Sequence, residues 1–250
     1  MSYLAPWLMR PLQKLALGAG IYMGWLDRFK SRAISAEDGN LAIFWEIRGE
    51  MLRESGRHLE ALGCFDRAVA LDPENHSSRA SMGNALGHLS RHGKALACFN
   101  RALELNSANK DAWLGKGCAH GSLGQLSDAL PCFERVLELD PENAMAWANR
   151  GLTFFHLGDH AVAMECCDRA LKLDPNASIA WVSKGVVLGS SGLHREALRW
   201  FDQALYIDPN AAVWRLMARG LRHLGRRDEA RECLEKAKLG ERSEKGMYTL

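Results

Sequence analysis

The sequence carries little net charge of either sign and has no long apolar run. Its 32 lysine and arginine residues nearly balance 30 aspartate and glutamate residues, which leaves a formal net charge of +2. A balance this even argues against a general nucleic-acid-binding role, because such proteins present a basic surface. No stretch reaches the roughly 18 uncharged apolar residues that mark a confident membrane-spanning helix. The composition is instead that of an ordinary soluble protein.

The motifs of catalysis and metal binding are also missing. The sequence contains no phosphate-binding glycine loop, no nucleophile elbow and no zinc-ligand pattern. Two His-x-x-x-His spacings occur, at His88/His92 and His156/His160, and such a pair could share a metal ion on one continuous helix. Both pairs straddle a place where a turn between helices is expected, so we interpret them as turn residues. We therefore predict no enzyme, no metal site and no cofactor.

The seven cysteines do not indicate a disulfide framework. Their number is odd and they are spread through helical sequence, which is typical of reduced thiols inside a cell. We therefore expect a cytoplasmic protein whose cysteines are small packing residues.

What the sequence does contain is a repeat of 34 residues, which is clearest when counting starts at Ala42. Tryptophan recurs at position 4, glycine at position 8, alanine at position 20 and phenylalanine at position 24. The tryptophans at position 4 are Trp45, Trp113, Trp147, Trp181 and Trp214, and Arg79 stands in the second unit. The six units are residues 42–75, 76–109, 110–143, 144–177, 178–210 and 211–238.

The residue types at these positions predict a pair of helices in each unit. Small residues at positions 8 and 20 let two helix backbones approach closely, and aromatic residues at positions 4 and 24 fill the space between hairpins. Glycine at position 15, as in Gly56 and Gly124, suits the left-handed end of the first helix. An Asp-Pro pair at the end of four units stops one helix and prepares the next. One hairpin cannot bury both of its faces, so neighbouring hairpins must stack.

These residues resemble the tetratricopeptide repeat (TPR) signature, with W at position 4, G at 8, A at 20, F at 24 and P at 32. The resemblance covers residues 42 to about 238. It implies an all-α fold, a right-handed superhelical solenoid of six TPR helical hairpins, and a scaffold that binds other proteins rather than an enzyme. Position 7 departs from the usual leucine in four units, where Arg48, Lys116, Arg150 and Lys184 stand. We expect their aliphatic stems to pack while their charges reach water.

In TPR proteins the first helix of each hairpin lines the concave groove, and positions 2, 5, 9, 12 and 13 usually point into it. The resemblance therefore implies a groove that is acidic at its N-terminal end, where Glu46, Glu50 and Glu54 stand, apolar in the middle and basic at its C-terminal end. The apolar candidates are Leu114, Cys118, Met145, Leu152, Phe155, Ile179, Val182 and Val186, and the basic candidates are Arg215, Arg219 and Arg222.

An exposed apolar patch usually marks a contact site, so we predict that the groove holds an apolar peptide or an amphipathic helix of another protein. The arginines could hold an acidic segment or a phosphate at its end. Two alternatives stay open. Some of the apolar residues could be buried between adjacent first helices, and the arginines could serve only to keep the last repeat soluble.

The two ends of the chain lack the repeat. Residues 1–41 combine an apolar segment with a polar linker, and the apolar run Leu15–Leu26 is about half a membrane span. Residues 1–26 could cap the array or lie on a partner, attach to a membrane surface, or span a membrane. The competing functions are therefore a membrane-associated assembly factor anchored by residues 1–26, and self-association through this segment. Residues 239–250 are expected to be a flexible tail.

Overall fold

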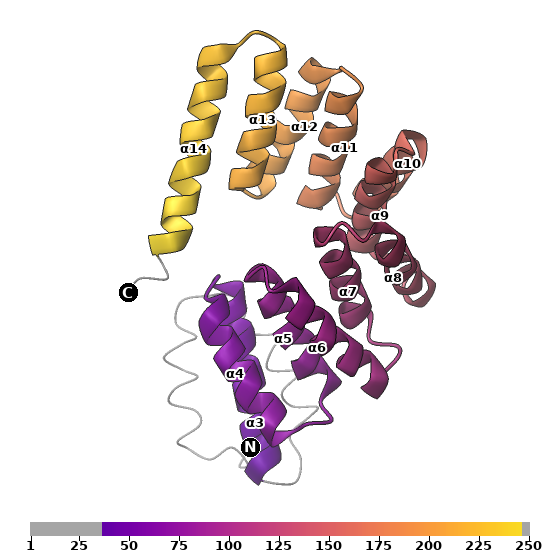
Figure 1. The fold of residues 1–250 in the computed structure, drawn as a ribbon, viewed down its shortest axis with the longest axis vertical. Coiled ribbons are helices and arrows are strands. Elements are labelled where there is room, and N and C mark those ends of the chain that lie inside the picture. The colour runs from indigo at the N-terminus through magenta and orange to yellow at the C-terminus, as the bar shows by residue number, and fades with distance from the viewer. Residues whose placement is uncertain (1–36, 247–250) are drawn as a thin grey trace.

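A computed structural model describes residues 37–246 of the chain and the side chains of residues 41–240. Within this range the chain forms twelve helices and no strand (Figure 1). The helices are α3 (Glu37–Glu54), α4 (His58–Leu71), α5 (His76–His88), α6 (His92–Leu105), α7 (Lys110–Ser122), α8 (Leu126–Leu139), α9 (Ala144–Leu157), α10 (His160–Leu173), α11 (Ser178–Ser190), α12 (His194–Ile207), α13 (Ala211–His223) and α14 (Arg227–Gly246). Successive helices pack in pairs from α3 and α4 to α13 and α14, which confirms the predicted all-α array of six hairpins.

Asparagine begins the first helix of most hairpins. The side chain of Asn143 accepts a hydrogen bond from the backbone N–H of Ala146 at 2.9 Å. Asn75, Asn109 and Asn210 cap α5, α7 and α13 in the same way. Each cap satisfies a donor that the helix end leaves unpaired and contributes about 1 kcal/mol.

The first helix of each described hairpin is followed by a residue with left-handed backbone. Five of these residues are glycines with positive φ, namely Gly56, Gly124, Gly158, Gly192 and Gly225. The second hairpin has Ser90 at this place, with φ 57°, and it is the only non-glycine residue with positive φ in the described part of the chain. A side chain costs roughly 1–2 kcal/mol in this region because Cβ crowds the backbone.

A phenylalanine of the second helix fills the space beside a glycine of the first helix in four hairpins. Phe133 in α8 is only 2% exposed, and a Cβ added at Gly117 in α7 would lie 2.6 Å from its ring. The same relation joins Gly49 to Phe65, Gly83 to Phe99 and Gly185 to Phe201. The other two hairpins have the pairs Gly151 with Cys167 and Ala218 with Leu234 at these positions. The two helices of a hairpin therefore approach closely because position 8 is small.

The first helices form the inner layer of the array. In the described part of the chain α5 contacts α7 and α9 contacts α11, whereas the second helices make no comparable contacts with one another. Each second helix instead contacts the first helix of the next hairpin, as α6 contacts α7. Because the first helices lie closer together, the stack bends with these helices inside. Figure 1 shows the resulting open ring, in which the C-terminal hairpin returns to the same side as the N-terminal hairpin.

The ends of the array differ from the predicted limits. α3 begins at Glu37, before residue 42, and α14 continues to Gly246 through part of the predicted 239–250 tail. The sequence after residue 238 has no proline, and the glutamate, arginine and lysine residues that follow Gly240 are good helix formers, so the helix continues past that glycine. The predicted N-terminal anchor, residues 1–26, lies outside the described residues. Among residues 37–246 no helix combines the length and the apolar character that crossing a membrane requires.

Candidate partner-binding surface

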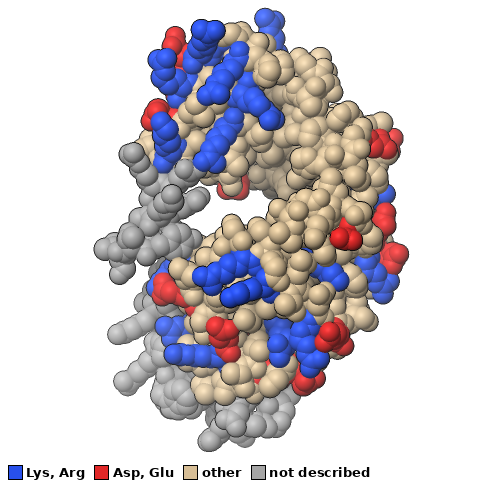
Figure 2. Space-filling view, in the orientation of Figure 1, with Lys and Arg blue, Asp and Glu red and all other residues tan. Residues whose placement is uncertain are grey.

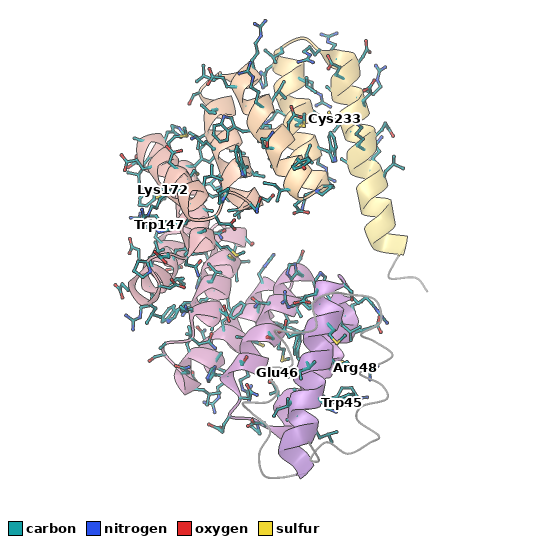
Figure 3. The ribbon with its side chains drawn as sticks, turned by 180° about the vertical axis from the view of Figure 1, so that it is seen from behind. Trp45, Glu46, Arg48, Trp147, Lys172 and Cys233 are labelled. Atoms are coloured by element: carbon teal, nitrogen blue, oxygen red, sulfur yellow. The ribbon has the colours of Figure 1, made fainter. Side chains whose placement is uncertain are left out.

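The tryptophans at position 4 stabilise the outer edge of the array. Figure 3 shows Trp147 at this edge, and its indole Nε1 donates a hydrogen bond to the carbonyl oxygen of Pro141 at 2.9 Å. Trp113 and Trp181 donate equivalent bonds to carbonyl oxygens six residues earlier. Each of these tryptophans therefore joins the loop before its hairpin to the first helix, a role beyond the predicted filling of space.

The unusual cations at position 7 lie on some of these rings. The Arg48 guanidinium is 5.4 Å from the centre of the Trp45 ring, and the Lys116 ammonium is 5.2 Å from that of Trp113. Figure 3 shows Trp45 and Arg48 on one side of α3 and Glu46 on the other. A cation over an aromatic face at such a site contributes about 0.5–1 kcal/mol. Position 7 thus belongs to the outer edge and not to the groove.

Met145 and Leu152 on α9 lie on the side opposite the outer edge, and Phe155 lies at an intermediate position, roughly 80° from Trp147 around the helix. Because an α-helix turns by about 100° per residue, Met145 and Leu152 point roughly 140–160° away from Trp147. Met145 is 54% exposed, and Leu152 and Phe155 are half-buried. The Phe155 ring also lies 5.2 Å, centre to centre, from the ring of His160. These three residues, Met145, Leu152 and Phe155, are called the apolar strip below.

The candidates on α7 and α11 are more enclosed. Leu114 and Cys118 are half-buried, and burial raises the pKa of the Cys118 thiol to about 11, so this thiol is neutral. Val182 and Val186 pack against the core that α11 shares with the last hairpin, and Ile179 packs against the core between the fourth and fifth hairpins. One side of these residues therefore serves packing between hairpins, and the other side remains open to solvent.

Glycine leaves open space beside the apolar residues of the first helices. A Cβ added at Gly121 on α7, or at Gly87 on α5, would find no neighbour within 4 Å. Gly117, one turn before Gly121, shows the opposite environment, since a Cβ there would meet the Phe133 ring. Glycine costs about 1 kcal/mol relative to alanine inside a helix. Close packing against Phe133 therefore explains why position 117 is glycine, but no packing contact explains the glycine at position 121.

The basic candidates come together on α13. Arg215, Arg219 and Arg222 are all exposed, and α13 contains no acidic residue. Figure 2 shows lysine and arginine side chains gathered over α13 and α14. The structure therefore places the basic candidates at the C-terminal end of the array, with α11 between them and the apolar strip on α9.

Two stacked pairs of histidines join neighbouring hairpins. The His58 and His88 rings are 4.3 Å apart with planes 4° from parallel, and the His194 and His223 rings are 4.4 Å apart. Burial lowers the pKa of both His58 and His88. Each pair joins position 17 of one unit to position 13 of the next, whereas the chain spacing suggested His88 with His92. Histidines at position 17 of one unit and position 13 of the next are visible in the sequence, but their pairing can be inferred only when the stacking of the hairpins is known.

The cysteines at position 23 are packing residues. Cys64, Cys132, Cys166 and Cys233 are buried and Cys98 is half-buried, all of them as free thiols. Burial raises the pKa of each of the five, which disfavours the reactive thiolate. No group of three or more histidine, cysteine or acidic residues within the described range could hold a metal ion.

Comparison with known families agrees with the repeat pattern. Two tetratricopeptide repeat models match the sequence, one over residues 76–109 and the other over residues 114–178 and 165–212. Together these matches cover more than half of the 250 residues. The chain therefore belongs to the tetratricopeptide repeat family, whose fold serves as a protein–protein interaction scaffold. No curated protein sequence matches the chain.

Solved structures share the fold at low sequence identity. A chain of the APC/C hetero-tetramer Cut9–Hcn1 has a TM-score of 0.71 at 19% identity, over 78% of this chain and 39% of that one. A thermophilic TPR protein of Thermus thermophilus has a TM-score of 0.64 at 21% identity, over 73% and 98% of the two chains. Pseudomonas aeruginosa pilF has a TM-score of 0.61 at 18% identity, over 82% and 94%. The chain spans much less than two thirds of the Cut9–Hcn1 chain, and at these identities the likeness concerns the fold alone.

Proposed function

We propose that the chain is an interaction scaffold whose inner wall holds an apolar peptide or an amphipathic helix of another protein. The observation that supports this proposal is the apolar strip on α9. Its most exposed member, Met145, is 54% exposed on the side of the helix away from Trp147. This residue contributes little to the core of the free protein, whereas a partner that covered it would remove apolar surface from water.

The spacing of the apolar residues suits a helical partner. Leu152 and Phe155 are three residues apart on α9, and Ile179, Val182 and Val186 are three and four residues apart on α11. α9 and α11 are in contact, so the two sets lie on neighbouring first helices. An amphipathic helix presents its own apolar residues at the same intervals and can pack along such a surface. The open face at Gly121 on α7 leaves room beside it.

Selection of peptides by the purified chain tests the proposal. A displayed random-peptide library is selected on the wild type, and the selected peptides are measured against Met145→Glu and Tyr206→Glu. Tyr206 is a matched control because it is an 86% exposed apolar residue on α12, a second helix of the outer layer. We expect apolar or amphipathic peptides whose affinity falls about tenfold or more in Met145→Glu, because the new carboxylate would be desolvated without a partner. Their affinity should be unchanged in Tyr206→Glu.

Two results would contradict the proposal that the apolar strip binds a peptide. One is a set of selected peptides that bind Met145→Glu as tightly as the wild type, and the other is an equal loss in both variants. Two alternatives remain predictions, because they concern residues outside the described range. One is a membrane-associated assembly factor anchored by residues 1–26, and the other is self-association through that segment.

A further inference from the structure

The last hairpin carries a concentration of positive charge that the apolar strip does not explain. Four arginines lie at the centre of this positive charge, and we call them the C-terminal basic surface. They are Arg219 and Arg222 on α13 and Arg227 and Arg231 on α14. All four side chains are exposed. Figure 2 shows lysine and arginine side chains clustered over these two helices, with a few acidic side chains beside them.

Other cations of the hairpin are paired with acidic residues. Arg226 donates to Glu229 at 2.6 Å, and the Lys238 ammonium lies 2.8 Å from Glu235. Both pairs join residues three apart in the sequence and are exposed, so each contributes little to stability but does neutralise its cation locally.

The arginines of the C-terminal basic surface are not neutralised in this way. Within residues 41–240 the structure shows no ion pair for Arg219, Arg222 or Arg227. Arg231 has only Asp228 at 3.6 Å, and both side chains are highly exposed. The surface therefore keeps several guanidinium groups that are available to an external anion.

Three of these arginines surround a hollow where α13 meets α14. Arg222, Arg227, Arg231 and Leu234 line this space of about 280 Å³. The guanidinium groups offer paired N–H donors that match a carboxylate, and Leu234 adds an apolar wall.

We propose that the C-terminal basic surface binds an acidic segment of a partner protein, in which an apolar side chain between carboxylates packs on Leu234. This inference rests on the proposed function only in that the chain binds a protein, and it does not depend on the apolar strip. The hollow has no aromatic wall on which a nucleic-acid base could stack.

Fluorescence anisotropy with the full-length chain tests this site. The probe is a fluorescein-labelled peptide of glutamates with a single central leucine, and the same peptide with lysines in place of glutamates is the negative control. The site variant is Arg222→Glu with Arg227→Glu. The control variant is Arg169→Glu with Arg199→Glu, which makes the same change of charge at exposed arginines on the second helices α10 and α12.

We expect the site variant to bind the glutamate peptide about tenfold or more weakly, because each attractive contact becomes repulsive. The control variant should stay within roughly twofold of the wild type, and Arg222→Gln with Arg227→Gln should give an intermediate loss. Since all these residues are exposed, circular dichroism should show unchanged helicity in every variant. Met145→Glu should leave the affinity for this probe unchanged, which separates this site from the apolar strip.

Three results would overturn the inference: no binding of the glutamate peptide by the wild type, an equal loss in the site and control variants, or a comparable loss in Met145→Glu. Phosphatidylserine vesicles and single-stranded RNA are measured alongside. If either binds more tightly than the peptide with the same dependence on Arg222 and Arg227, the surface recognises that anion and the acidic-peptide assignment is wrong.

Discussion

Replacing Gly117 by alanine should destabilise the third hairpin, although alanine is the better helix former. The change gains about 1 kcal/mol of helix propensity. However, the new Cβ would lie 2.6 Å from Cε1 and 2.8 Å from Cζ of Phe133, closer than ordinary carbon contacts allow. The Phe133 ring is 2% exposed, so neighbouring atoms enclose it on nearly all sides. Overpacking of this kind costs about 1–3 kcal/mol and outweighs the gain in propensity, so we expect a net loss of up to about 2 kcal/mol in the free energy of unfolding.

Urea unfolding followed by circular dichroism measures this loss. Gly121→Ala is the matched control, because it makes the same substitution in the same helix where a Cβ meets nothing within 4 Å. It should stabilise the protein by up to about 1 kcal/mol. Adding Phe133→Leu to Gly117→Ala should relieve the clash, since the last hairpin already combines Ala218 with Leu234. If Gly117→Ala proved as stable as Gly121→Ala, the close contact between glycine and phenylalanine would not be what sets the helix spacing.

Three further predictions concern the turns, the hairpin junctions and the outer edge. Ser90→Gly should raise the free energy of unfolding, measured in urea, by about 0.5–1 kcal/mol, because relief of the left-handed serine outweighs the added entropy of the unfolded chain. Gly124→Ser should lower the free energy of unfolding, because it places a serine in the same left-handed conformation. Equal stability of Ser90→Gly and the wild type would refute the idea that Ser90 is strained. Burial lowers the pKa of His58 and His88 in the folded protein, so the unfolded chain binds more protons than the folded chain at mildly acidic pH. The contribution of these two histidines to stability should therefore be constant above about pH 6.5 and should decrease as the pH falls below that value. His88→Gln should make this decrease shallower between about pH 7 and pH 5, and an unchanged slope would contradict the assignment. Trp147→Phe should cost about 1 kcal/mol in thermal unfolding, because the loop carbonyl loses its indole donor, and no loss would show that water replaces this bond.

Much of the local structure followed from residue types at fixed positions. Glycine at position 15 predicted the turn inside each hairpin, and even the exception, Ser90, adopts the same left-handed backbone. Alanine and glycine at positions 8 and 20 predicted close helices, which the contact between Gly117 and Phe133 shows. The end of α14 was less predictable, because no proline follows position 238 and the length of the helix depends on weak propensities.

The structure distinguishes among the predicted binding residues by how exposed they are. The resemblance placed Met145 and Val182 on the same footing, as residues of the concave groove. The structure separates them, because Met145 is 54% exposed while Val182 packs against the core shared with the last hairpin. How much of a side chain remains open depends on the distance between neighbouring first helices, and a repeat position does not specify that distance.

The sequence by itself determined the six hairpins, their order and their family, because the required residues recur at a period that one helix pair occupies. Only the tertiary structure decided which side chains meet between helices, both across neighbouring hairpins and within one hairpin. His58 stacks on His88, and Arg222 comes beside Arg231, because neighbouring helices pack with a particular offset and crossing angle. That geometry arises from the packing of many side chains at once, and the sequence pattern of a single helix does not contain it.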